Sequence, residues 1–194
     1  LLNGVRHMEV LDQRFGRERI LGGVAHIAAV MTSDGAVAQL TKMHSLTAGG
    51  RDARTQALAE RLMAVCKPAR FDSVLSTDIE SALWAKWVFL AALAGMTTLM
   101  RASVGDIVAT PQGAALMHRM YQECLRTAEA AGHAIAAEAR QQALAMLQKA
   151  ASPLTASMLR DMEAGLRTEH AHVLGDMLRR AEAAGVDAPL LAAA

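Results

Sequence analysis

Lys86 is the only charged residue in an apolar stretch of nineteen residues that runs from Ala82 to Met100. A segment of this length and composition is typical of a helix buried inside a protein. A lysine in such a helix must reach water, pair with an acid, or lie in a cleft where burial lowers its pKa. In the third case it is a proton donor near neutral pH. The alternative is a lysine at the helix edge whose stem covers apolar surface while its charge reaches water.

Three other groups could take part in chemistry. Asn3 and Gly4 lie at an expected strand-to-helix turn, where the amide could bind a cofactor or substrate, although the pair alone is more simply explained by ordinary turn chemistry. Ser157 begins a short expected helix, where a helix cap is the default role of a serine. Glu169 lies in the first turn of the last long helix, a position that the helix dipole favours for any carboxylate.

Several classes of function are disfavoured. The sequence contains no GxGxxG, GxxxxGK[ST], HExxH or GxSxG motif, and His170 and His172 are two residues apart, on different faces of a helix. We therefore expect no metal site. Twenty basic and nineteen acidic residues leave a net charge of +1 with no basic block, which argues against nucleic acid as a partner.

The sequence also indicates a compartment. The uninterrupted apolar run after Lys86 covers only Trp87 to Met100, shorter than the ~20 residues needed to cross a bilayer, so we expect a soluble core helix and no membrane partner. Cys66 and Cys124 are far apart and form no CxxC pair, which suits buried free thiols in a reducing compartment. No signal peptide is recognisable, and a cytoplasmic location is expected.

The first seventy-five residues alternate between strand and helix patterns. We expect, in chain order, a helix over Val5–Phe15, strands over Arg19–Met31 and Ala36–Leu46 joined by a turn at 33–35, a helix over Asp52–Cys66 and a strand over Phe71–Leu75. Leu58, Leu62 and Val65 share one face of the expected helix.

From residue 76 onward the pattern is purely helical. Thr77 to Glu80 matches a capping box that would open the helix carrying Lys86, and Thr110-Pro111 matches an N-cap followed by proline. The later helices are expected over 138–150, up to Gly165, and over 168–184, with a further first turn from Pro189. The expected fold is mainly α (α+β), with a boundary near Ser76 that separates residues 1–75 from an all-helical domain of residues 76–194.

Taken together, several short segments resemble the ketopantoate reductase (2-dehydropantoate 2-reductase) family over essentially the whole chain. They are Asn3-Gly4, Leu83-Trp-Ala-Lys86, Ser157-Met-Leu-Arg-Asp161, Thr168-Glu169 followed by Gly175, and the closing Ala184-Gly-Val-Asp-Ala-Pro189. The resemblance implies a Rossmann domain that binds NADPH, of which residues 1–75 are the last part. It also implies an all-helical substrate and dimer domain like the C-terminal domain of 6-phosphogluconate dehydrogenase.

The resemblance also implies residue roles. Lys86 matches the general acid that protonates the C2 oxygen of a 2-keto acid as hydride arrives from NADPH. Asn3 matches an asparagine between nicotinamide and substrate, and Ser157 a substrate-binding residue. Glu169 and the backbone of Ala28 match contacts to the cofactor. An ammonium group suits its role because it neutralises a developing alkoxide and supplies its proton.

Two departures from the family pattern concern the substrate. Members usually carry asparagines four and eight residues after the lysine, one and two helical turns along the same face, where this chain has Leu90 and Ala94. An aspartate common two residues after the glutamate is Ala171 here. A pocket lined by leucine and alanine fits a more apolar 2-keto acid than 2-dehydropantoate.

The glycine-rich first βα turn of such a nucleotide domain is expected roughly a hundred residues upstream of this chain. Without it, the chain as it stands is expected not to bind NADPH with normal affinity. Three functions remain open: a 2-dehydropantoate reductase, a paralogue that reduces another 2-keto acid, and a non-catalytic helical dimerisation or binding module. A homodimer is expected for the enzyme.

Overall fold

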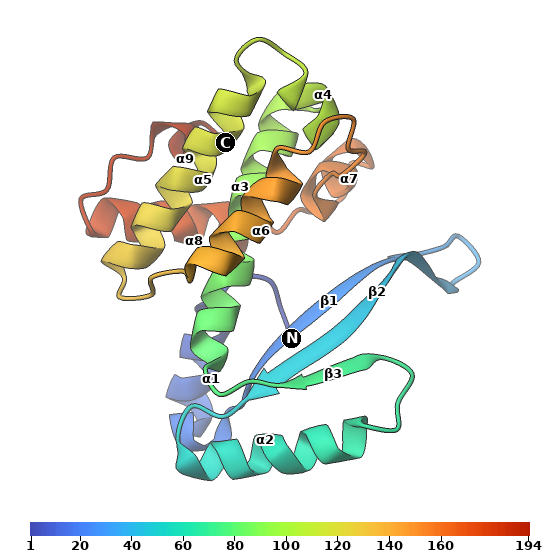
Figure 1. Cartoon of the computed structure of the whole chain (residues 1–194), viewed down its shortest axis with the longest axis vertical. Coiled ribbons are helices and arrows are strands. Elements are labelled where there is room, and N and C mark those ends of the chain that lie inside the picture. The colour runs from blue at the N-terminus through green and yellow to red at the C-terminus, as the bar shows by residue number, and fades with distance from the viewer. The chain divides into compact units, whose positions relative to one another are not determined.

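The computed structural model describes all residues from Leu1 to Ala194. They form two compact units, which we call unit 1 (Leu1–Leu83) and unit 2 (Trp84–Ala194). Unit 1 holds a three-stranded sheet with α-helices, and unit 2 holds helices alone. Figure 1 shows these elements with their labels. This arrangement confirms the expected mainly α fold. The division falls a few residues after the expected boundary near Ser76 and lies inside a continuous helix.

Unit 1 is a small α/β unit. Its elements are α1 (Arg6–Phe15), a 3-10 turn (Arg17–Arg19), β1 (Gly22–Met31), β2 (Val37–Gly49), α2 (Ala53–Cys66) and β3 (Asp72–Leu75). The sheet order is β1-β2-β3, with β1 antiparallel and β3 parallel to β2. Because α2 joins two parallel strands and contacts both, β2, α2 and β3 form a βαβ unit.

Local sequence signals explain these elements. Gly16 ends α1 with a φ of 86°, and Gly35 closes the β1–β2 turn with a φ of 82°, both values that an L side chain rarely adopts. Asp52 caps α2, because its carboxylate accepts from the Thr55 amide at 2.7 Å while the Thr55 hydroxyl accepts from the Asp52 amide at 3.0 Å. This reciprocal capping box fixes the start of α2 where the sequence predicted it.

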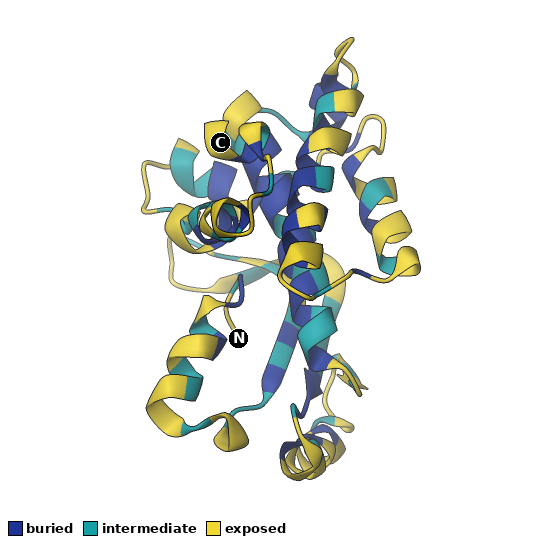
Figure 2. Ribbon diagram, turned by 90° about the vertical axis from the view of Figure 1, so that its left-hand side faces the viewer, coloured by how far each residue is buried: buried dark blue, intermediate teal, exposed yellow.

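Unit 2 contains only helices. The first of them, α3, begins in unit 1 and has most of its length in unit 2. The helices are α3 (Ile79–Met100), α4 (Val104–Val108), α5 (Gly113–Ala130), α6 (Ala137–Leu147), α7 (Ser157–Glu163), α8 (His170–Ala183) and α9 (Pro189–Ala193). Figure 2 shows that α3 is dark blue over much of its length, and Trp87, Val88 and Ala91 have no exposed surface. By length and composition α3 could span a membrane, but 61% of its most apolar window is buried within the protein. A buried core helix passes the same test, so this is weak evidence for a span.

Two expected helix starts were wrong. Asp78, not Thr77, precedes α3, and its carboxylate accepts from the Ser81 amide at 3.0 Å. Glu80 could not complete the expected box because it pairs with Arg51 at 2.9 Å. The helix expected at Thr110 begins instead at Gly113, after the short and unexpected α4. The backbone at Gly113 lies too close to the Ile107 carbonyl to admit a side chain, so glycine is required there.

Candidate active site

Lys86 lies half-buried in the second turn of α3, directly before the fully buried Trp87. Burial lowers the pKa of the Lys86 ammonium from its ordinary value, and the negative charge of Glu169 opposes that shift. Both groups belong to unit 2. Half-burial of Lys86 is compatible both with a partly desolvated ammonium and with a stem that covers apolar surface at the helix edge.

Leu90 and Ala94 continue the line of Lys86 along α3 at intervals of four residues. With a rise of about 1.5 Å per residue, Ala94 lies about 12 Å along the helix from Lys86. Leu90 is half-buried and Ala94 is 3% exposed. The row therefore offers one ammonium group and two apolar side chains, with no hydrogen-bonding side chain at the positions where the family usually carries asparagine.

Ser157 is the exposed first residue of α7. It was expected as a helix cap, but Ala156 holds the capping position and no side chain caps this helix. The Ala156 amide donates to the hydroxyl of Thr97 at 3.4 Å, and Thr97 lies one turn beyond Ala94 on α3. This bond ties the start of α7, and with it Ser157, to the far end of the row that begins at Lys86.

Glu169 is the half-buried residue that immediately precedes α8. Its side chain makes no capping hydrogen bond to this helix. Its backbone carbonyl accepts from the Val173 amide at 3.0 Å, which fixes the first turn of α8. The structure thus brings Glu169 into electrostatic range of Lys86, although eighty-two residues of sequence separate them.

The two remaining candidates belong to unit 1. Asn3 is half-buried in the bend before α1, and Gly4 next to it has a φ of 78°. Ala28 lies in β1 where the β1–β2 register shifts, because Ile27 pairs with His44 and Ala29 with Gln39. Ala28 therefore has no partner in the register, so its backbone suits a contact to a bound group.

An aromatic and charged cluster, not anticipated from the sequence, joins α3 to α8. The cluster consists of Trp84, Trp87, Asp176 and Arg180. The Arg180 guanidinium lies 5.5 Å from the ring centroids of both tryptophans and pairs with Asp176 at 3.2 Å. Asp176 is 2% exposed. The spacing of Asp176 and Arg180 on α8 was a visible i,i+4 signal, but nothing in the sequence said that it faces α3.

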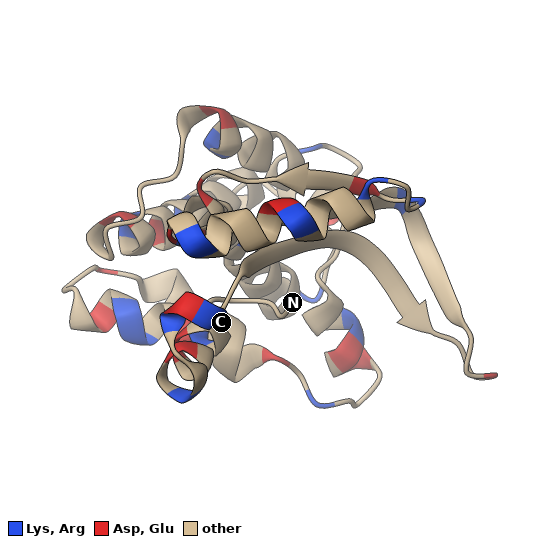
Figure 3. Ribbon diagram, turned by 90° about the horizontal axis from the view of Figure 1, so that it is seen from below, with Lys and Arg blue, Asp and Glu red and all other residues tan.

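An open cavity of about 480 Å³ in unit 1 contains none of the candidate residues. Its arginine, Arg51, is paired with Asp12 at 2.5 Å and with Glu80 at 2.9 Å. Figure 3 shows acidic and basic positions interspersed along α2, which borders this cavity. The charges here serve the structure of unit 1.

Comparison with known proteins decides the family. Residues 78–194 match ketopantoate reductase PanE/ApbA C terminal, and residues 1–52 match ketopantoate reductase PanE/ApbA. The chain belongs to the ketopantoate reductase family. An uncharacterized oxidoreductase of Bacillus subtilis is 30% identical over an alignment that covers 98% of this chain and 63% of that protein.

Solved structures agree with this family. A 2-dehydropantoate 2-reductase from Geobacter metallireducens is 28% identical with a TM-score of 0.86, covering 99% of this chain and 64% of that one. A D-mandelate dehydrogenase in complex with NADH has a TM-score of 0.85 at 18% identity, over 99% of this chain and 65% of that one, and so shares the fold. The chain therefore spans slightly less than two thirds of the ketopantoate reductase relatives that it matches.

Proposed function

We propose that the whole protein to which this chain belongs is an NADPH-dependent reductase of a 2-oxo acid. The observation that supports this most directly is Lys86, a half-buried lysine on a core helix within electrostatic range of Glu169, at the position of the family's general acid. In a member of the ketopantoate reductase family, that arrangement favours an enzyme over a purely structural helical module.

The chemistry requires one hydride and one proton. A nicotinamide cofactor supplies the hydride to C2 when it is bound. Lys86 donates its proton to the C2 oxygen, so that the carbonyl becomes a hydroxyl and the lysine is left neutral. Burial favours this transfer because it destabilises the charged ammonium, while the negative charge of Glu169 raises the pKa of the lysine against that effect.

The other candidate residues take binding roles in this proposal. Asn3 lies between substrate and nicotinamide, the unpaired backbone of Ala28 and the carboxylate of Glu169 contact the cofactor, and Ser157 binds the substrate. We further propose a homodimer in the cytoplasm. Cys66 and Cys124 are both free, as a reducing compartment requires, although Cys66 is only half-buried.

A second substrate has a specific observation in its favour. Leu90 and Ala94 present no polar group to a hydroxyl, and an unpaired substrate hydroxyl costs roughly 1–3 kcal/mol. We therefore propose that an apolar 2-oxo acid, with a branched aliphatic or aromatic side chain, is a better substrate than 2-dehydropantoate. A D-mandelate dehydrogenase shares the fold of this chain. For that reason phenylglyoxylate, the oxo acid that corresponds to mandelate, belongs in the test panel.

The deciding experiment measures kcat/KM of the full-length enzyme with NADPH and with NADH against 2-dehydropantoate, 2-oxoisovalerate and phenylglyoxylate. We expect NADPH-dependent turnover, with an apolar acid preferred about ten- to a hundredfold. If neither cofactor is oxidised with any of the 2-oxo acids, the proposed reductase function is rejected. A kcat/KM near ~10⁵ M⁻¹s⁻¹ for 2-dehydropantoate, within the ordinary enzyme range, would reject the apolar preference alone.

The same preference can be reversed by substitution. Leu90→Asn with Ala94→Asn should raise kcat/KM for 2-dehydropantoate about tenfold or more relative to the apolar acid. Leu99→Asn is the matched control, because Leu99 is 42% exposed on the same helix and lies outside the row. If the control and the double variant have equal effects on kcat/KM, Leu90 and Ala94 do not line the substrate pocket.

A further inference from the structure

Trp87 connects the helix of Lys86 to the helix of Glu169 through a single buried hydrogen bond. Its indole N–H donates to the carbonyl oxygen of Val173 on α8 at 3.0 Å. Trp87 is fully buried and Val173 is 3% exposed, so no water competes for this bond. In such surroundings a hydrogen bond fixes the separation of two elements more firmly than in water.

The same valine also holds Glu169. The Val173 amide donates to the Glu169 carbonyl at 3.0 Å, while the Val173 carbonyl accepts from Trp87. One peptide bond joins Trp87 to Lys86. Two hydrogen bonds and the Val173 backbone therefore form a continuous connection between the two charged residues, and a shift of α8 against α3 would alter their separation.

We propose that Trp87 is a positioning residue that sets the distance between the Lys86 ammonium and the Glu169 carboxylate through its bond to Val173. This inference rests on the proposed reductase function and adds to it a residue for which the family resemblance supplied no role. Trp87 touches neither the substrate nor the cofactor in this scheme. It acts only through the placement of α3 against α8.

The proposal has a defined electrostatic consequence. Charged or titratable groups near this segment of unit 2 include Glu169, Asp176 with its partners Arg179 and Arg180, His170 and His172 in the first turn of α8, and His133, which stacks on Trp84 with the ring centroids 4.5 Å apart. Glu169 is the one whose charge raises the pKa of Lys86 against the effect of burial. If the Trp87–Val173 bond is lost and Glu169 moves away, the pKa of Lys86 falls. Because the acid must be protonated, the alkaline limb of kcat/KM then moves to lower pH.

The test is Trp87→Phe in the full-length enzyme, which removes the N–H donor and keeps an aromatic ring. We expect the alkaline limb of kcat/KM to move down by about half a pH unit or more. Trp84→Phe is the matched control, since Trp84 has the same contact to Arg180 but donates no bond to Val173. The control should leave the limb in place. A tryptophan analogue with sulfur in place of the indole N–H, inserted at position 87, repeats the test if Trp87→Phe does not fold.

The Glu169→Gln variant distinguishes a change in the placement of Glu169 relative to Lys86 from a general loss of packing in the core. On that background Trp87→Phe should cause no further movement of the limb, because the charge that it places has gone. An unchanged limb in Trp87→Phe, or an equal shift with and without Glu169, would overturn the proposal. NMR titration of labelled lysine, with Lys86 assigned through Lys86→Arg, follows the same pKa without turnover. It therefore tests the inference even if the enzyme reduces none of the 2-oxo acids.

Discussion

The two units of this chain differ in how they cover their apolar side chains. Unit 2 leaves few large apolar residues exposed, namely Leu99, Met100, Met146 and Leu166. Unit 1 is smaller but exposes many more, on the β-hairpin, on α1 and on α2. Figure 2 shows exposed residues of every type in yellow, and both helices carry many of them. Leu58, Leu62 and Val65, which the sequence placed on one face of α2, are 40%, 41% and 74% exposed. A contiguous exposed apolar face of this kind usually marks a surface that something else covers.

The two units also differ in whether their buried polar groups have hydrogen-bond partners. In unit 2 the fully buried Glu123 accepts from the amides of Leu190 and Leu191, at 3.3 and 2.9 Å, and so closes α9 onto α5. In unit 1 the Nδ1 atom of His7 is buried without a partner. Burial, and then the positive charge of the amino terminus, lower the pKa of that histidine. The buried side-chain polar groups of unit 2 therefore all have hydrogen-bond partners, whereas unit 1 buries one imidazole nitrogen without a partner.

The largest expected effect concerns cofactor binding, which we predict to be absent from the isolated chain. The phosphate groups of a dinucleotide bind to backbone amides of a glycine-rich turn and to a helix N-terminus, and this chain has no GxGxxG. Calorimetry of the isolated chain should show no NADPH binding at micromolar concentrations, while the full-length protein binds. A dissociation constant in the low micromolar range for the isolated chain would contradict the assignment of residues 1–75.

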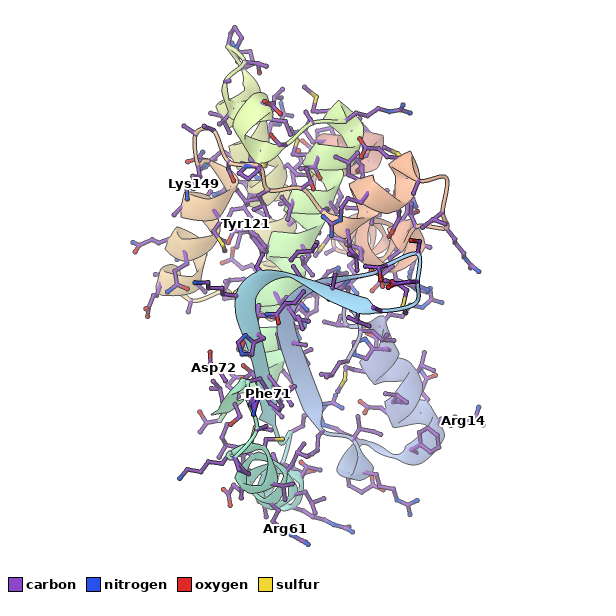
Figure 4. The ribbon with its side chains drawn as sticks, turned by 90° about the vertical axis from the view of Figure 1, so that its right-hand side faces the viewer. Arg14, Arg61, Phe71, Asp72, Tyr121 and Lys149 are labelled. Atoms are coloured by element: carbon purple, nitrogen blue, oxygen red, sulfur yellow. The ribbon has the colours of Figure 1, made fainter.

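The next effect concerns the chemistry assigned to unit 2. Lys86→Ala in the full-length enzyme should lower kcat by about 10²-fold or more with unchanged circular dichroism, because the alkoxide loses its proton donor. Lys149→Ala is the control, since Lys149 follows the end of α6 with its side chain exposed in Figure 4. A loss of less than about threefold in Lys86→Ala would remove the lysine from the mechanism.

A smaller effect tests whether the apolar face of α2 is covered in the longer protein. Val65→Lys should change the unfolding free energy of the isolated chain by no more than about 0.5 kcal/mol, as exposed substitutions do. In the full-length protein the same change should cost roughly 1–3 kcal/mol, because the ammonium is then buried without a partner. Leu166→Lys, at a site 62% exposed in unit 2, should be nearly neutral in both proteins. Equal costs for Val65→Lys in the two proteins would mean that this face stays in water.

The smallest effect concerns the capping box of α2. Hydrogen bonds from the Thr55 amide and then its hydroxyl lower the pKa of Asp52 below its unfolded value of 3.8. A carboxyl whose folded pKa is depressed stabilises the fold above the unfolded pKa, and the contribution is lost as pH falls through the folded value. Asp52→Ser keeps an acceptor for Thr55 but does not titrate. Thermal unfolding of the isolated chain should therefore lose less stability on acidification in Asp52→Ser than in wild type, and parallel curves would exclude the linkage.

The sequence by itself determined the class of fold and the order of nearly all elements. These follow from local physics, because helix periodicity and turn signals such as that at Gly35 depend on neighbouring residues only. The family resemblance added roles for individual residues, of which Lys86 is the clearest. Where local signals overlapped, as at Thr77 and Asp78, the sequence chose wrongly by one residue, because the distant Arg51 engages Glu80.

Only the tertiary structure decided what surrounds Lys86. No sequence pattern placed Glu169 beside it, Trp87 against Val173, or Arg180 across two tryptophans, because each of these contacts joins residues of α3 to residues of α8 far along the chain. Helix periodicity says which face of a helix is apolar but not which partner that face meets. The burial and the neighbouring charge that act on the pKa of Lys86 arise where these helices meet, and so they belong to the folded structure.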